Sequence, residues 1–211
     1  MSDEPNDTVP DEEPSAGSIA FWEEVGIEPV GIDLPADGGF TLRHYVETDE
    51  TEEAEEVPVF LGSGGAIHLF RSPKGLVDFI RSDAPHDLSA VESWDSVRAA
   101  VDLEVVPQRL NRYELDLVVE IARAGASGWG DSEREVLLLA GEIARDMAYY
   151  TARADLLAML APGSPLDDLD DDLRAPGRFS RRKLRKYNPD QIALSWRRIV
   201  RELETVVQWH D

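Results

Sequence analysis

The spacing of apolar residues changes near Ser72, and this change limits the fold more than any other feature of the chain. Before Ser72 apolar residues alternate with others, as Val30, Ile32 and Leu34 do, which is the period of a strand with one buried face. After Ser72 they recur every three or four residues, which is the period of a helix. Strand signals gathered before this point and helix signals after it favour an α+β fold.

Two glycine-rich segments, Asp37–Gly39 and Gly62–Gly65, each lie between alternating apolar segments. Glycine adopts the positive φ angles that tight hairpin turns need. The four predicted strands are residues 30–34, 40–46, 57–61 and 66–70. Strands joined as consecutive hairpins predict a small antiparallel sheet of two hairpins, packed with a predominantly helical C-terminal half.

Helix starts are predicted from capping residues. Ser72 followed by Pro73 predicts a helix through Ile80, because proline suits the first helical position. Four further pairs have the capping-box spacing: Ser89/Glu92, Asn111/Glu114, Ser132/Glu135 and Asn188/Gln191. The helix from Ser132 is expected to be the longest and to run towards Leu160. A last helix carries an apolar stripe from Ile192 to Val207.

The charge of the chain is concentrated near its start. The formal net charge is −22, and residues 1–60 hold 18 acidic side chains against one basic side chain, Arg43. Residues 1–16 are predicted to form a disordered acidic tail, because they are rich in Pro and Ser and lack apolar periodicity. Residues 17–211 are predicted to form a single α+β domain, with a sheet-containing half (17–105) and a helical half (106–211).

Composition indicates a cytoplasmic protein that does not insert into a membrane. No apolar run approaches the roughly 18 residues that a membrane-spanning helix needs. The acidic first residues are the reverse of a secretory signal, and the chain has no cysteine for a disulfide framework or a thiolate metal site.

None of the candidate catalytic or metal-binding residues has the neighbouring residues that such a site requires. The four histidines form no metal-binding pair in sequence, and Ser63 lies in a hairpin turn where a nucleophile elbow would need a following helix. The acidic run from Leu166 to Leu173 lacks the glycine and glutamate of a calcium loop, so a short helix capped by Ser164 is expected instead. We therefore expect no enzyme activity, no cofactor and no metal.

The helical half has more apolar side chains than one buried stripe requires. Methionine and tyrosine suit adaptable binding surfaces, although a helical core alone would also contain them. We expect this half to bind unfolded or partly folded client proteins in an apolar groove. The candidate partner-binding residues are Leu138, Met147, Tyr150, Met159, Trp196 and Val200.

A basic segment, residues 178–187, offers an alternative function. Its cationic side chains are Arg178, Arg181, Arg182, Lys183, Arg185 and Lys186, and Arg197, Arg198 and Arg201 follow. Interleaved Phe179 and Tyr187 fit a nucleic-acid-associated accessory protein of the primosome or replication type. The overall acidity of the chain opposes binding to nucleic acid. We expect instead that the adjacent acidic run neutralises the basic segment within the fold, or that the basic segment binds a protein partner.

Several segments together resemble a known family. They are Phe21–Val30, Phe40–Arg43, Val59–Gly62, Leu69–Ser72 and Phe79–Leu88. The chain resembles an actinobacterial family labelled "primosomal protein" and is similar to the C-terminal domain of the mycobacterial export chaperone SatS. The resemblance implies a domain that shields export substrates in hydrophobic grooves without ATP and works with the accessory Sec machinery. It carries no catalytic residues.

Overall fold

The structure is a computed structural model that describes residues 13–48, 55–100, 103–175 and 183–211. The chain divides into two compact units. The first unit comprises Met1–Arg112 and Val206–Asp211, and the second comprises Tyr113–Thr205. A sheet with helices in the first unit and a helical second unit confirm the α+β class. In the described part of the chain, no helix combines the length and the apolar character needed to cross a membrane.

The sheet is larger than the two hairpins predicted. Its strands are β1 (Ile27–Asp33), β2 (Gly38–Thr48), β3 (Glu55–Phe60), β4 (Gly62–Ser63), β5 (Ala66–Phe70), β6 (Arg112–Glu114) and β7 (Val207–His210). The main order is β4-β5-β2-β1-β6, and β3 and β7 pair with β2 and β5 respectively. The β1–β2 and β4–β5 hairpins are antiparallel, and Gly64 and Gly65 turn the second one with positive φ angles. The long β2 pairs with β3 through its second half and meets β5 at Phe40.

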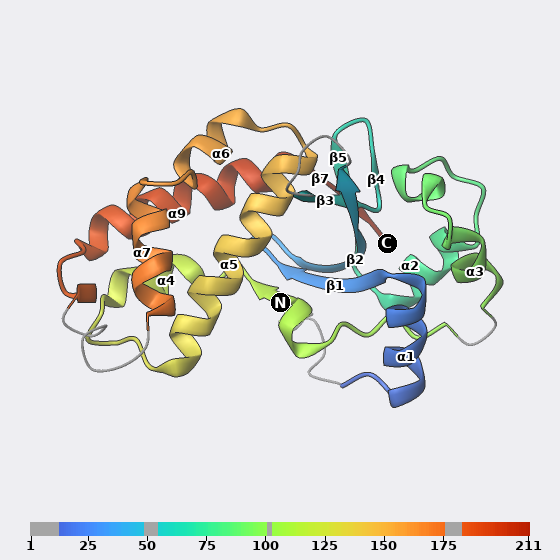
Figure 1. The fold of residues 1–211 in the computed structure, drawn as a ribbon, viewed down its shortest axis with the longest axis horizontal. Helices are drawn as coiled ribbons and strands as arrows, with labels where there is room; N and C mark the ends of the chain where they lie inside the picture. Colours follow the sequence, from blue (N-terminus) through green and yellow to red (C-terminus); the bar gives the residue numbers. More distant parts are fainter. Residues whose placement is uncertain (1–12, 49–54, 101–102, 176–182) are drawn as a thin grey trace, which may run out of the picture. The chain divides into compact units, whose positions relative to one another are not determined.

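The last strand, β7, was not expected from the sequence. The apolar stripe predicted a helix through Val207, but the helix ends at Glu204 and β7 then pairs in parallel with β5 (Figure 1). The Thr205 hydroxyl donates to the Glu202 carbonyl at 2.6 Å, which closes the last turn. The β-branched residues from Thr205 to Val207 favour extended backbone, so the chain leaves the helix here.

Gly39 leaves room for the Trp209 side chain of β7 beside β2, and this gives a testable prediction. A Cβ at position 39 would lie 2.8 Å from the Trp209 ring and 3.2 Å from Leu69 Cβ. We expect Gly39→Ala to displace Trp209 and lower the melting temperature by roughly 3 °C, as a small overpacking change does. Circular dichroism would measure the melting, and hydrogen exchange would report on β7. Gly17→Ala, which meets no atom within 4 Å, is the control; equal melting of the two variants would contradict the prediction.

Three helices of the first unit complete its core (Figure 1): α1 (Ala16–Val25), α2 (Pro73–Ile80) and α3 (Trp94–Ala99). Ser15 caps α1 and its hydroxyl donates to Glu104 at 2.6 Å; residues 1–12, which make up most of the predicted tail, lie outside the described residues. Ser72 caps α2 as expected, with its hydroxyl accepting from the Gly75 N–H. The core cluster contains Trp22, Val25, Ile27, Phe40, Leu42, Leu61, Phe70, Leu76, Ile80, Leu88, Trp94, Val97 and Val105.

The second unit consists mainly of helices: α4 (Val118–Ala124), α5 (Asp131–Tyr150), α6 (Ala154–Met159), α7 (Pro165–Arg174) and α9 (Pro189–Glu204). The single helix expected from Ser132 to Leu160 is wrong, because it is broken after Tyr150. The Thr151 hydroxyl donates to the Met147 carbonyl at 2.6 Å, and Ala152 then takes a positive φ of 54°. A left-handed residue cannot continue a right-handed helix, so α6 starts afresh.

Of the four predicted capping pairs, one caps a helix as predicted, one is displaced by two residues and two start no helix. Asn188 caps α9 as predicted, since its side chain accepts from two backbone N–H groups. The pair at Ser132 is displaced: Gly130 precedes α5, and the Glu133 carboxylate accepts its N–H at 2.8 Å. The other two pairs start no helix, because Ser89 donates to the His86 carbonyl inside a 3₁₀ turn and Asn111 leads into β6. Ser and Asn side chains also stabilise turns, which explains these errors.

Candidate functional site

The structure separates the six candidate partner-binding residues into two groups. Met147, Trp196 and Val200 are buried, with relative exposures of 0%, 3% and 3%, so their side chains belong to the interior. Leu138, Tyr150 and Met159 are partly exposed. The interior position of Trp196 and Val200 follows from the stripe that predicted them, since the apolar face of an amphipathic helix packs inwards.

Met159 lies in a groove between α6 and α9. The groove has a volume of about 440 Å³ and is lined by Met159, Leu194, Ser195, Arg197, Arg198 and Arg201. Met159 is the last residue of α6, and the other lining residues belong to α9. We call this feature the α6–α9 groove. All of its lining residues lie in the second unit.

The outer face of α9 combines one apolar side chain with cations. Leu194 is 64% exposed, the highest value among the exposed large hydrophobic residues. Arg197, Arg198 and Arg201 follow it by three, four and seven positions, so the four side chains share one helix face. Leu194 was not among the predicted residues, because the apolar stripe of α9 marks its buried face. A leucine within the polar face of the helix is the signal that would have identified it.

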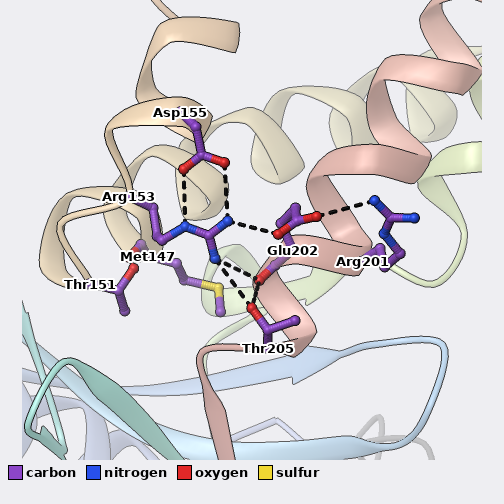
Figure 2. A network of polar contacts seen from close by, with 7 residues as sticks. All are labelled: Met147, Thr151, Arg153, Asp155, Arg201, Glu202 and Thr205. Atoms are coloured by element: carbon purple, nitrogen blue, oxygen red, sulfur yellow. Dashed lines mark hydrogen bonds and ion pairs between the residues drawn. The ribbon is translucent and has the colours of Figure 1, made fainter.

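Arg153 joins the start of α6 to the end of α9 (Figure 2). Its guanidinium donates to both carboxylate oxygens of Asp155, at 3.0 and 3.1 Å, and to Glu202 at 2.8 Å. It also donates to the Thr205 hydroxyl at 3.2 Å. These bonds lower the pKa of the Asp155 and Glu202 carboxyls and raise that of Arg153. The network thereby fixes α6 against α9 and holds the two sides of the groove together.

Two cations at the groove are free to meet a ligand. Arg197 and Arg198 are exposed, and neither has an ion-pair partner in the described part of the chain. Arg201 makes one exposed contact, at 3.2 Å to Glu202. The groove can therefore contact an apolar side chain through Met159 and Leu194 while offering guanidinium groups to an anion.

Part of the predicted basic segment is neutralised inside the second unit. Lys183 and Lys186 form ion pairs with Asp172 at 3.3 and 2.9 Å, and the Tyr187 hydroxyl donates to the same carboxylate at 2.8 Å. The Lys186 bond, with help from Tyr187 and Lys183, lowers the pKa of Asp172 to about 2. Asp172 lies in α7, which Ser164 caps as expected. Arg185 is exposed, and Arg178, Arg181 and Arg182 lie outside the described residues.

A second hollow, of about 820 Å³, lies in the first unit and differs in charge. Its lining includes Val46, Val59 and Val91, with the carboxylates of Asp87 and Glu92. Val46 is 40% exposed. This hollow has apolar surface but would favour a cationic ligand, whereas the α6–α9 groove would favour an anionic one.

Three histidines that are distant in sequence converge in the first unit. The His68 and His210 rings lie 4.8 Å apart, and both lie within 6 Å of the Phe79 ring. The His86 ring contacts Phe79 at 5.9 Å and Trp94 at 4.3 Å. We call these three residues the histidine cluster. The cluster could not be predicted from the sequence, because β5, β7 and the turn before η1 (Asp87–Ala90) come together only in the folded chain. Within the described residues, no three His, Asp or Glu side chains are placed to hold a metal ion.

Comparison with known proteins identifies the family. The model of the SatS C-terminal domain matches residues 27–204, which is most of the chain. This chain belongs to the SatS C-terminal domain family. Its fold also matches a solved structure described as the crystal structure of the SatS C-terminal domain in complex with bromine. That match has a TM-score of 0.73 and 27% sequence identity, and covers 90% of this chain and 97% of the other. No curated protein matches the chain.

Membership of the SatS family confirms the resemblance first seen in the strand and turn segments. Those segments, from Phe21 to Leu88, all belong to the first unit. The matched region extends beyond them to residue 204 and includes every lining residue of the α6–α9 groove.

Proposed function

We propose that this SatS-family chain is a cytoplasmic protein-binding chaperone or adaptor. It holds apolar segments of unfolded or partly folded clients without ATP, serves protein export with the accessory Sec machinery, and catalyses no reaction. The observation that carries the proposal is the α6–α9 groove, where Leu194 is 64% exposed beside Met159. The neutralisation of Lys183 and Lys186 by Asp172 weighs against the nucleic-acid alternative.

The groove has the physical properties that reversible client binding requires. Covering an exposed leucine with a client side chain gains about 25 cal/mol for each Å² of apolar surface buried. The unbranched Met159 side chain adapts to partners of different shape. The net charge of −22 keeps a loaded complex soluble by mutual repulsion.

Replacing Leu194 by glutamate should impair client holding. The charged side chain cannot be buried against an apolar client without a large desolvation cost. We expect the protein to suppress light scattering by a thermally aggregating client, and Leu194→Glu to need at least about threefold more protein for the same suppression. The matched control is Leu110→Glu, because Leu110 is 55% exposed but lies in the first unit outside both hollows. Circular dichroism would verify that both variants fold.

Two outcomes would contradict the proposal at different levels. If the unaltered protein gives no suppression at a several-fold excess over the client, the chaperone function is wrong. If Val46→Glu removes suppression and Leu194→Glu does not, clients bind in the hollow of the first unit and the assignment to the α6–α9 groove is wrong.

A further inference from the structure

Cations surround the apolar anchor of the α6–α9 groove at defined distances. With a rise of about 1.5 Å per residue, Arg197 and Arg198 lie roughly 5–6 Å along the helix axis from Leu194, and Arg201 lies about 10 Å from it. All three arginines project from the exposed face of α9 and line the groove. An apolar side chain bound at Leu194 would therefore have guanidinium groups on one side of it.

From this arrangement we propose that the α6–α9 groove selects extended client segments in which carboxylates lie two or three residues from an apolar anchor. An extended peptide advances about 3.3 Å per residue, so two or three residues span the distance from Leu194 to the arginines. Guanidinium groups bind carboxylates through paired hydrogen bonds, which lysine cannot form in the same geometry. The inference rests on the proposed function and names the class of client.

The free state of the arginines supports this selectivity. Arg197 and Arg198 have no ion-pair partner in the part of the chain that the structure describes, although the chain has about twice as many acidic as basic side chains. Lys183 and Lys186, by contrast, are both paired with Asp172 in the same unit. Cations kept unpaired beside an exposed leucine are available to a partner, and carboxylates are the complementary groups of a peptide.

A peptide fits the groove better than a nucleic acid does. Proteins that bind single strands without sequence preference stack bases on aromatic side chains, and no aromatic residue is among the lining residues of the groove. Two of the six lining side chains are Met159 and Leu194, which contact apolar groups. A net charge of −22 also repels a polyanion more strongly than it repels a short peptide with few carboxylates.

Binding of three labelled peptides tests the proposal. The peptides share one central leucine in an otherwise polar, uncharged segment and carry glutamate, glutamine or lysine two and three residues from it. Fluorescence anisotropy with the full chain should give an affinity about tenfold higher for the glutamate peptide than for the lysine peptide, since each exposed ion pair contributes modestly. The difference should shrink in about 0.5 M salt, because exposed charges are then screened.

Charge reversal at the groove provides the second measurement. The double variant Arg197→Glu/Arg198→Glu should reverse the order, so that the lysine peptide binds more tightly than the glutamate peptide. Arg197→Gln/Arg198→Gln should remove most of the preference without reversing it. The matched control is Arg123→Glu, which alters an exposed arginine of α4 outside the groove and should keep the original order.

The outcomes distinguish this proposal from the proposed function. If the three peptides bind with equal affinity and Leu194→Glu weakens all of them, the groove holds clients but the charge selectivity is wrong. If Arg197→Glu/Arg198→Glu binds the peptides as the unaltered protein does, the selectivity is also overturned. If none of the peptides binds, both the selectivity and the groove as a client site are wrong. If a short single-stranded oligonucleotide displaces the glutamate peptide at lower concentration than the unlabelled peptide does, the occupant is a nucleic acid and the proposal fails.

Discussion

Lowering the pH from 7.5 to 5.5 should lower the melting temperature of the protein by roughly 5 °C. The cause is the histidine cluster. Burial lowers the pKa of His68, His86 and His210 below the ordinary value of 6.5, because the charged imidazolium is poorly solvated there. The stabilisation is complete above about pH 6.5 and is lost as the pH falls towards the lowered pKa values.

The surroundings of the cluster explain why neutral rings are favoured. Besides burial, positive charge on His210 or His86 lowers the pKa of His68, and the positive charge of Arg98 lowers the pKa of His86. Asp87 and Asp211 attract protons to the cluster and partly offset this effect. Nδ1 of His68 and of His86 and Nε2 of His210 are buried with no hydrogen-bond partner among the described residues, so an added N–H there would remain unsatisfied.

Substitutions of the histidines distinguish the contribution of the histidine cluster to acid sensitivity from that of carboxylates, which also titrate at low pH. His68→Gln/His86→Gln should melt at a lower temperature at pH 7.5 but lose much of the decrease between pH 7.5 and 5.5. His44→Gln, which alters the histidine of β2 outside the cluster, should keep the full decrease. Calorimetry at closely spaced pH values would measure these slopes. An unaltered slope in the double variant would show that other groups cause the acid sensitivity.

Arg153→Ala should lower the melting temperature by roughly 5 °C, because it removes the cation that pairs with Asp155 and leaves Glu202 with only the exposed contact to Arg201. The Arg153 side chain is 24% exposed and joins α6 to α9 through Asp155, Glu202 and Thr205 (Figure 2). Arg153→Lys keeps the charge but loses the planar fork, so we expect it to recover only part of the loss. The same substitutions should weaken client binding, since one side of the α6–α9 groove is then free to move.

Arg201 offers a matched control on the same acceptor. It also donates to Glu202, at 3.2 Å, but its side chain is 71% exposed. Arg201→Ala should change the melting temperature by no more than about 2 °C, as is usual for an exposed ion pair. Equal effects of Arg153→Ala and Arg201→Ala would contradict the role given to the Arg153 network.

The sequence was sufficient wherever local chemistry decides the structure. The Ser72 and Asn188 caps, the turn at Gly64 and Gly65 and the short helix after Ser164 act within a few residues of themselves, and all were predicted correctly. The glycine turn predicted at Asp37–Gly39 is wrong, because hydrogen bonds between Leu34 and Asp37 close the first hairpin and Gly38 and Gly39 begin β2 without positive φ angles. Predictions were wrong where the same residue type stabilises more than one kind of local structure. Asn111 and Ser89 fit a capping pattern, but the first leads into a strand and the second stabilises a turn.

The candidate site could be predicted only in part. Helical spacing identified the right element, α9, but it directed attention to Trp196 and Val200 on the buried face. Which apolar residues remain exposed depends on the neighbouring helices, which one sequence does not show. The meeting of Met159 with Leu194 depends on the left-handed residue at Ala152, which ends α5 and lets α6 return along α9. The histidine cluster could not be predicted for the same reason, because its three residues are distant in sequence and come together only in the fold.

The position of β7 has a consequence for how the chain folds during its synthesis. Residues 113–205 form a unit that is inserted between two parts of the first unit, and β7 supplies the neighbouring strand of β5 only after this insertion has been made. Domains emerge from the ribosome in order and fold as units. The sheet that precedes the helical unit therefore stays incomplete, with one side of β5 unpaired, until residues 207–210 emerge.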